Sequence, residues 1–257
     1  RRQRQMCIRD RPYIEQKAKH DMPKDGNPDL DSPAQLEGAR LMLIDPVGII
    51  YCPTRRNGKF VNSGKIIRFA NNSAVNPVEA RGFVGRSDYA ANAGDVSIGG
   101  GQGGPGGLTS TYLWLTTTKT GLLKDDLEGR EISGISFQRS EIAIKHITDG
   151  TTHTYFAGEK YLDPRGYEDG KDTGDNETWC TGHNNDNFRT TASRPSMDGV
   201  NPDNPNDAEN GTIFGSAHAT IWNASYCDGH VESLSYDIDP IVHKNRGNRH
   251  DGNVASP

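Results

Sequence analysis

Histidine and carboxylate side chains in the second half of the chain are the groups whose types could support chemistry. His218, Asp228, His230 and Glu159 stand out, because a histidine beside a carboxylate can bind a metal ion or exchange protons with a substrate. Spacing alone assigns no third partner to them. The HExxH pattern of zinc peptidases and the GxSxG pattern of serine hydrolases are both absent. We therefore expect structural roles for these residues and no catalytic residue.

Asp228-Gly229 is the strongest hairpin signal in the sequence, since Asp-Gly favours a tight turn between strands. It predicts strands at residues 221–227 and 230–235. A two-residue turn would pair Cys227 with His230, because the length of a hairpin loop fixes the strand register.

The same hairpin predicts where His218 lies relative to the turn. A bend near Ala219-Thr220 followed by a strand of about six residues, roughly 20 Å long, places His218 at the end opposite Asp228. We expect a partly buried His218 that contacts backbone or a neighbouring segment, either residues 149–152 or Glu159. Asp228 should accept hydrogen bonds from nearby turn amides.

Acidic residues in the middle of the chain are candidate calcium ligands. Asp169, Asp172, Asp175 and Glu177 offer hard oxygen atoms, but their spacing misses the EF-hand pattern. We expect a solvated acidic loop, with calcium as the one cofactor that these residues leave open. The Gly-rich stretch Ser97–Gly107 resembles a phosphate cradle but lacks the Gly-Lys-Ser/Thr ending of a P-loop, so nucleotide binding is not expected.

The four cysteines do not have the spacing of a zinc site. Cys7 lies near the start, and Cys52, Cys180 and Cys227 form no CxxC pair. Two of the latter three could form a disulfide in an exported protein, or all three could be separate thiols. The sequence leaves these alternatives open.

Composition favours a loop-rich protein outside the membrane. Of 257 residues 32% are apolar, below the usual share of about 45%, and there are 30 Gly and 14 Pro. The longest apolar stretch, Leu41–Tyr51, is interrupted by Asp45-Pro46 and is too short to span a bilayer. The net charge is −5, and an acidic protein is a poor partner for nucleic acid.

The first eleven residues differ sharply from the rest. They carry five Arg and one Asp, which leaves a charge of −9 on the remainder. Residues 1–11 resemble translated sequencing-adapter DNA, and the alternative is a genuine basic arm. We expect this segment to make few contacts, with Met6 and Ile8 unburied.

The pattern of apolar and turn-forming residues predicts one α+β domain over residues 12–257, led by antiparallel strands. Residues 163–209 are expected to form an irregular surface insertion, because they are rich in Asn, Asp and Pro. Helical segments are expected at Pro12–His20 and, capped by Ser140, at Glu141–Ile147, and strands at Leu41–Ile44, Val47–Tyr51, Phe60–Phe69, around Ile135 and Phe137, and at Thr154–Tyr161, after an Asp149-Gly150 turn.

Four ordered motifs resemble an uncharacterised prepilin-like family of planctomycete-type bacteria (domain of unknown function 1559). They are Tyr51–Arg56, Ser87–Asp95, Ile147–Thr152 with Gly158–Lys160, and Phe214–His218 with Asp228-Gly229. The last has the family's spacing of a His, nine residues and Asp-Gly. Pro12–Gln16 also resembles the segment that follows the family's membrane helix.

This resemblance implies a type IV pilin or pseudopilin-like fold, with an N-terminal helix packed on an antiparallel sheet. The prepilin signal and apolar helix are absent from the sequence, so export to the envelope or cell exterior, and attachment to the membrane through that helix, are implied only by the resemblance. Its signature residues, for which we expect structural roles, are His218, Asp228, Gly229, Asp149, Gly150 and Glu159.

Three functions follow from these observations. The first is a non-catalytic envelope subunit of a type II secretion or type IV pilus-like assembly, whose partners are other pilin-like subunits or envelope proteins. The second is a secreted module that binds carbohydrate or another partner, with Trp179 and Trp222 stacking on sugar rings. The third is a metal-dependent hydrolase centred on His218, which requires a pocket with convergent ligands.

Overall fold

The computed structural model describes residues 16–26, 32–45, 47–56, 61–62, 69–70, 73–74, 83–97, 132–137, 140–182, 184–200 and 211–253. The predictions for residues 1–11, with Met6 and Ile8, lie outside these residues. So do the predictions for residues 98–107 of the Gly-rich loop and for most of Phe60–Phe69. No described helix has the length and apolar character needed to cross a membrane.

The fold is α+β, with few helices and a mixed, mostly antiparallel sheet. Within the described residues, the α-helices are α2 (Lys17–Asp21), α3 (Pro33–Ile44) and α4 (Pro240–Gly247), and single 3₁₀ turns occur at η3 (Gly48–Ile50), η6 (Ile144–His146) and η7 (Pro164–Gly166). The strands are β1 (Val61–Asn62), β2 (Phe69–Ala70), β3 (Ser73–Ala74), β4 (Phe83–Val84), β5 (Tyr89–Asn92), β6 (Tyr155–Glu159), β7 (Phe188–Arg189), β8 (Ser196–Met197), β9 (Gly215–Ser216), β10 (Ile221–Tyr226) and β11 (Val231–Ser235).

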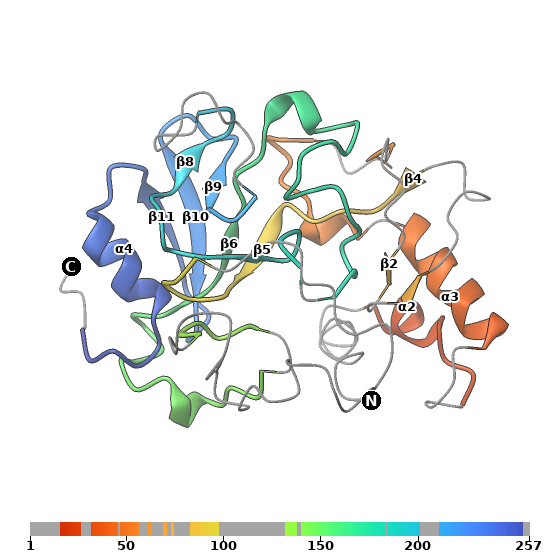
Figure 1. The fold of residues 1–257 in the computed structure, drawn as a ribbon, viewed down its shortest axis with the longest axis horizontal. Coiled ribbons are helices and arrows are strands. Elements are labelled where there is room, and N and C mark those ends of the chain that lie inside the picture. The colour runs from red at the N-terminus through yellow and green to blue at the C-terminus, as the bar shows by residue number, and fades with distance from the viewer. Residues whose placement is uncertain are drawn as a thin grey trace.

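The main sheet has five strands in the order β11-β10-β6-β5-β7. Its first four strands pair antiparallel, as expected, whereas β7 pairs parallel to β5. Strands β8 and β9 form a separate parallel pair beside it. Figure 1 shows the sheet at the centre, with α4 on one side and α3 at the far end of the molecule.

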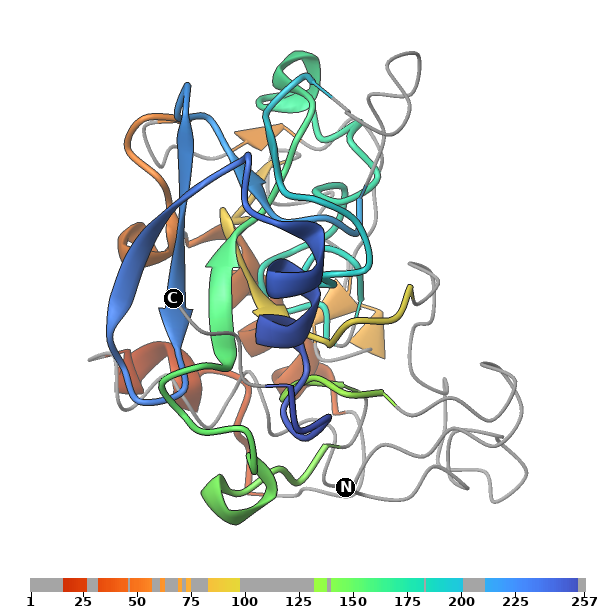
Figure 2. The same cartoon turned by 90° about the vertical axis from the view of Figure 1, so that its left-hand side faces the viewer.

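An aromatic cluster joins the sheet to α4, which lies across one face of the strands in Figure 2. Tyr155, Trp222 and Phe214 are fully buried, and the rings of Phe214 and Trp222 stack with centroids 5.1 Å apart. Gly158 leaves room for these rings, since a Cβ there would lie 2.5 Å from the Trp222 side chain. The cluster fixes β6 against β10, which positions the C-terminal end of β6 for the site described below.

Residues 41–44 are helical, which corrects the prediction of a strand there. Ser32 caps α3 by accepting a hydrogen bond at its Oγ from the Gln35 amide, with Pro33 at the first helical position. Ala39, Met42 and Leu43 are buried on one face of this helix. A short apolar run in a sequence does not distinguish a strand from a helix. Here the Ser32 cap and the buried apolar face of α3 favour the helix.

Residues 47–51 also fail to form the predicted strand. A single 3₁₀ turn, η3, occupies their centre, and the chain leaves it extended at Tyr51. Val47 packs in the cluster around α3, so its burial is satisfied without strand pairing.

Two further local predictions are wrong around residues 135–147. No strand forms at Ile135 and Phe137. The amides of Ile135 and Ser136 both donate to the carbonyl of Asn92, the last residue of β5, and the expected helix at 141–147 shrinks to η6. Ile142 packs against a core cluster but Ile144 is 76% exposed, so little apolar surface is buried that would stabilise a longer helix. The predicted strand at Thr154–Tyr161 is confirmed as β6.

The C-terminal hairpin is confirmed, but its predicted register is wrong by one residue. Ser225 pairs with Val231, and the Tyr226 amide donates to the His230 carbonyl, so the loop has three residues. Gly229 has a φ of +94°, the left-handed conformation that a three-residue loop with a bulge requires. This geometry prevents the pairing of Cys227 with His230.

Residues 163–200 pack into the body of the protein, which corrects the expectation of a surface insertion. Its described residues contain η7 and two short strands, yet many of its polar residues are buried, and residues 201–209 of the predicted insertion lie outside the described part of the chain. Asp175, Thr178 and Arg189 are each fully buried. Their polar groups make internal hydrogen bonds and ion pairs.

Candidate functional site

His218 lies in the bend between β9 and β10, and its position there is fixed by three hydrogen bonds. Its amide donates to Ser216 Oγ at 3.1 Å, and the Tyr236 hydroxyl donates to the carbonyls of both His218 and Ser216, at 2.8 and 3.1 Å. The side chain is 28% exposed, as the prediction of partial burial required. This bend directs the imidazole back toward the end of β6.

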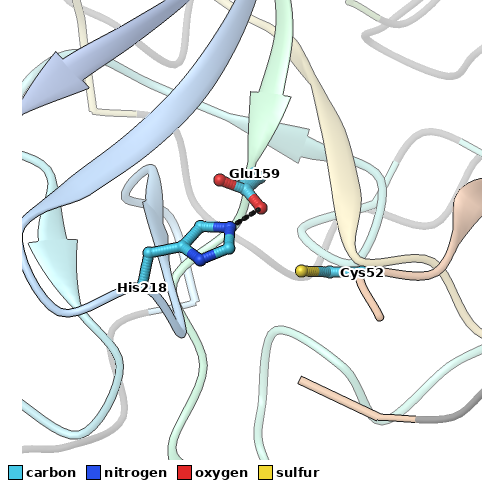
Figure 3. Close-up of side chains that lie close together, drawn as sticks. All are labelled: Cys52, Glu159 and His218. Carbon is cyan, nitrogen blue, oxygen red and sulfur yellow. Dashed lines mark ion pairs between the residues drawn. The ribbon is translucent and has the colours of Figure 1, made fainter. Parts of the chain in front are cut away.

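The imidazole meets Glu159, the last residue of β6, which confirms one of the two contacts predicted for His218. His218 Nε2 lies 3.3 Å from Glu159 Oε1, and Figure 3 shows the ring facing the carboxylate. The other oxygen, Oε2, accepts hydrogen bonds from the backbone amide and the side-chain amide of Asn223, at 2.8 and 3.0 Å. One carboxylate oxygen is therefore held by β10, while the other faces His218.

Cys52 is a third member of this group, which sequence reasoning missed. Its thiol, the imidazole and the carboxylate each offer an atom within 4.8 Å of the others. Figure 3 shows these three side chains close together. Cys52 follows η3, and its amide donates to Asp88 Oδ2 at 2.7 Å. No spacing rule links a cysteine to a glutamate more than a hundred residues away, although Cys52 does belong to the first of the four motifs.

The environment of the Cys52 thiol favours its protonated form. Burial raises the pKa of Cys52, while the Thr54 amide opposes this shift and the Glu159 carboxylate adds to it. A cation bound between the thiol and the carboxylate would reverse this preference, because a metal ion stabilises the thiolate.

The remaining signature residues lie away from this group. Asp228 is at the hairpin turn, where its Oδ1 accepts the His230 amide at 3.1 Å, as predicted. Asp149 accepts the amides of Asp251 and Gly252, at 2.8 and 3.0 Å, so it ties its own turn to the C-terminal segment. Gly150 and Gly229 both have positive φ values, which suits their turns. His218 and Asp228 therefore do not form a dyad.

A network of buried charges lies next to Cys52. Arg55 binds Asp198 at 2.8 Å and Asp88 at 3.2 Å, and Arg56 binds Asp88 at 2.7 Å and Asp175 at 2.6 Å. These side chains are almost completely buried. Removing one partner of such a pair is strongly destabilising, because it leaves an uncompensated charge in the protein interior.

The network explains the ionisation of Asp175. Burial by itself raises the pKa of this carboxyl, but Arg56 and Lys160 beside it, the latter at 2.9 Å, outweigh burial and hold the pKa below its ordinary value. Asp175 is therefore an anion in the protein interior and is not available to calcium.

The four candidate calcium ligands do not converge. Asp169 pairs with exposed Lys171, and Asp172 accepts the amides of Asp163 and Gly174. Glu177 contacts Thr181. Within the described part of the chain, Cys52, Glu159 and His218 are the one group of three such side chains close enough to share a metal ion.

The other cysteines and the tryptophans do not extend the site. No disulfide joins Cys52, Cys180 and Cys227. Trp179 and Trp222 are 8% and 0% exposed, which corrects the expectation that they could stack on sugar rings.

Comparison with known proteins gives one match. The family described as "Protein of unknown function (DUF1559)" matches residues 8–241, which confirms the family that the four motifs indicated. Neither the curated proteins nor the solved structures contain a match to this chain.

Proposed function

Because the chain belongs to the DUF1559 family, we propose that it is a non-catalytic, exported envelope protein and a pilin- or pseudopilin-like subunit of a type II secretion or type IV pilus-like assembly. One observation supports this proposal. The four family motifs contact one another inside the protein, and several of their charged side chains are buried in ion pairs with one another or with Asp175 and Asp198.

The first two motifs are joined by ion pairs. Arg55 and Arg56 both contact Asp88, and all three side chains are buried. The third and fourth motifs are joined by Glu159 and His218. Cys52 then brings the first motif to this second pair. Motifs whose residues mainly connect distant segments favour a structural role for the domain over a catalytic one.

The alternatives have less support. A sugar-binding module would need exposed aromatic residues, and the two tryptophans considered for that role are buried. A hydrolase would need a proton-transfer group and a substrate position beside the metal ligands. The described residues around His218 are engaged in internal contacts, so we favour the structural role.

The decisive experiment is to isolate the native protein from cells that carry the gene and to determine its N-terminus by mass spectrometry. A methylated N-terminal residue, followed by an apolar segment, together with recovery in the envelope or in the sheared surface fraction, would support an assembled subunit. An ordinary signal-peptidase N-terminus and recovery in the medium as a monomer would support a free secreted module. Recovery in the cytoplasm would refute both.

In-cell crosslinking adds a test of assembly. A ladder of crosslinked copies, or a crosslink to another envelope protein, is expected for a subunit. A monomer at every crosslinker concentration would contradict the proposal.

A further inference from the structure

We propose that Cys52, Glu159 and His218 form a binding site for a single divalent transition-metal ion, with zinc as the expected ion. The site goes beyond the function proposed above and does not depend on it. Its expected effect is to fasten three segments that are distant in the sequence: the turn after η3, the end of β6 and the bend before β10.

The spacing of the ligand atoms suits one ion. In a tetrahedral zinc site with bonds of about 2.0–2.3 Å, two ligand atoms lie roughly 3.3–3.8 Å apart. His218 Nε2 and Glu159 Oε1 are already 3.3 Å apart. The Cys52 thiol lies within 4.8 Å of both, so an adjustment of about 1 Å, such as a rotation of its short side chain, completes the set.

The ligand types point to zinc rather than to calcium or magnesium. Thiolate and imidazole are the donors that zinc prefers, whereas calcium and magnesium select sites made of oxygen atoms. Three protein ligands leave a fourth position, which in zinc proteins is occupied by water. The partly exposed His218 side chain provides the route from solvent to the otherwise buried group.

Charge gives an independent argument for a cation. Glu159 is 1% exposed, and its one ion-pair partner among the described residues is His218. The other buried carboxylates nearby, Asp88, Asp175 and Asp198, each bind an arginine. A metal ion at the site would supply Glu159 with the permanent positive charge that those neighbours receive from arginine.

The surrounding hydrogen bonds orient the ligands before an ion arrives. Asn223 binds Glu159 Oε2 and leaves Oε1 facing the other two ligands. Asp88 holds the Cys52 amide, and Tyr236 holds the His218 carbonyl. Such outer contacts are characteristic of metal sites, where their loss weakens binding about 10- to 100-fold.

The test uses the purified chain after treatment with a chelator and dialysis. Titration with zinc chloride is followed by calorimetry, and titration with cobalt chloride by absorption spectroscopy, because tetrahedral cobalt with a thiolate ligand has intense visible bands and a sulfur-to-metal charge-transfer band. We expect one equivalent of each ion to bind and the apparent melting temperature to rise with zinc concentration.

Variants identify the ligands. Cys52→Ser should abolish the charge-transfer band, His218→Ala should abolish stoichiometric binding, and Asn223→Ala should weaken it about 10- to 100-fold as a positioning residue. Glu159→Gln keeps the shape of the side chain but removes its charge, so weaker binding by a variant with native circular dichroism separates ligand loss from misfolding.

Cys227→Ser and His230→Ala are the matched controls, since both residues lie at the opposite end of the hairpin from His218. They should bind zinc as the original chain does. Absence of stoichiometric binding, or equal loss of binding in these controls, would overturn the metal site. Neither result would affect the proposed envelope role, which is tested by the native N-terminus and by fractionation.

Discussion

His243 gives a quantitative prediction for the pH dependence of stability. This residue of α4 is fully buried among aromatic rings, with centroids 5.7 Å from Tyr155 and Trp222 and 6.3 Å from Phe214. Neither ring nitrogen has a hydrogen-bond partner among the described residues. Burial, and secondarily the charge of Arg246, lowers the pKa of His243 from 6.5 to about 3.

The sign follows from proton linkage. The folded state holds His243 neutral, whereas in the unfolded state His243 is protonated below about pH 6.5. Above that pH His243 therefore does not reduce the free energy of unfolding. The free energy of unfolding decreases progressively as pH falls from 6.5 toward 3, because only the unfolded state binds the proton in that interval. Each pH unit in that interval removes about 1.4 kcal/mol, so the free energy of unfolding loses about 2 kcal/mol between pH 7 and pH 5 from this residue alone.

The assay compares urea unfolding of the original chain with that of His243→Leu at pH 7, 6 and 5, followed by tryptophan fluorescence. Leucine changes the packing by an amount that is independent of pH. The difference in unfolding free energy between the two proteins should therefore move by about 2 kcal/mol in favour of His243→Leu on going from pH 7 to pH 5.

His153→Leu is the control, because His153 is only half-buried and lies outside the aromatic cluster. Its stability should follow the pH dependence of the original chain. Parallel curves for His243→Leu and the original chain would refute the argument, since they would mean that His243 is protonated equally in the folded and unfolded states.

Two further predictions concern the interior. Asp175→Asn leaves buried cations without their partner and should reduce the free energy of unfolding by about 3–5 kcal/mol in urea, whereas Lys171→Met breaks an exposed pair and should change it by less than about 1 kcal/mol. Equal effects would contradict the role assigned to the buried network. Gly158→Ala places a methyl group 2.5 Å from the Trp222 ring and should cost about 1–3 kcal/mol, measured by the same assay. An unchanged denaturation midpoint would contradict this prediction, because it would mean that the aromatic rings shift to accommodate the methyl group.

Local sequence signals identified the elements that local contacts stabilise. Asp228-Gly229 predicted the hairpin, the segment after the Asp149-Gly150 turn was correctly predicted as the strand β6, and the spacing from His218 to the turn correctly separated His218 from Asp228. The ordered motifs identified the family. The hairpin loop is one residue longer than predicted, because the choice between two- and three-residue loops depends on the conformation of Gly229 in the folded hairpin.

Tertiary contacts decided the rest. Residues 41–44 are helical because α3 buries one apolar face. Residues 163–200 pack in the interior because buried arginine and lysine side chains neutralise their carboxylates. Cys52 reached Glu159 and His218 only through the closure of the whole chain. Charge pairing and ligand convergence depend on distances in space, and residues far apart in the sequence acquire those distances only when the core has packed.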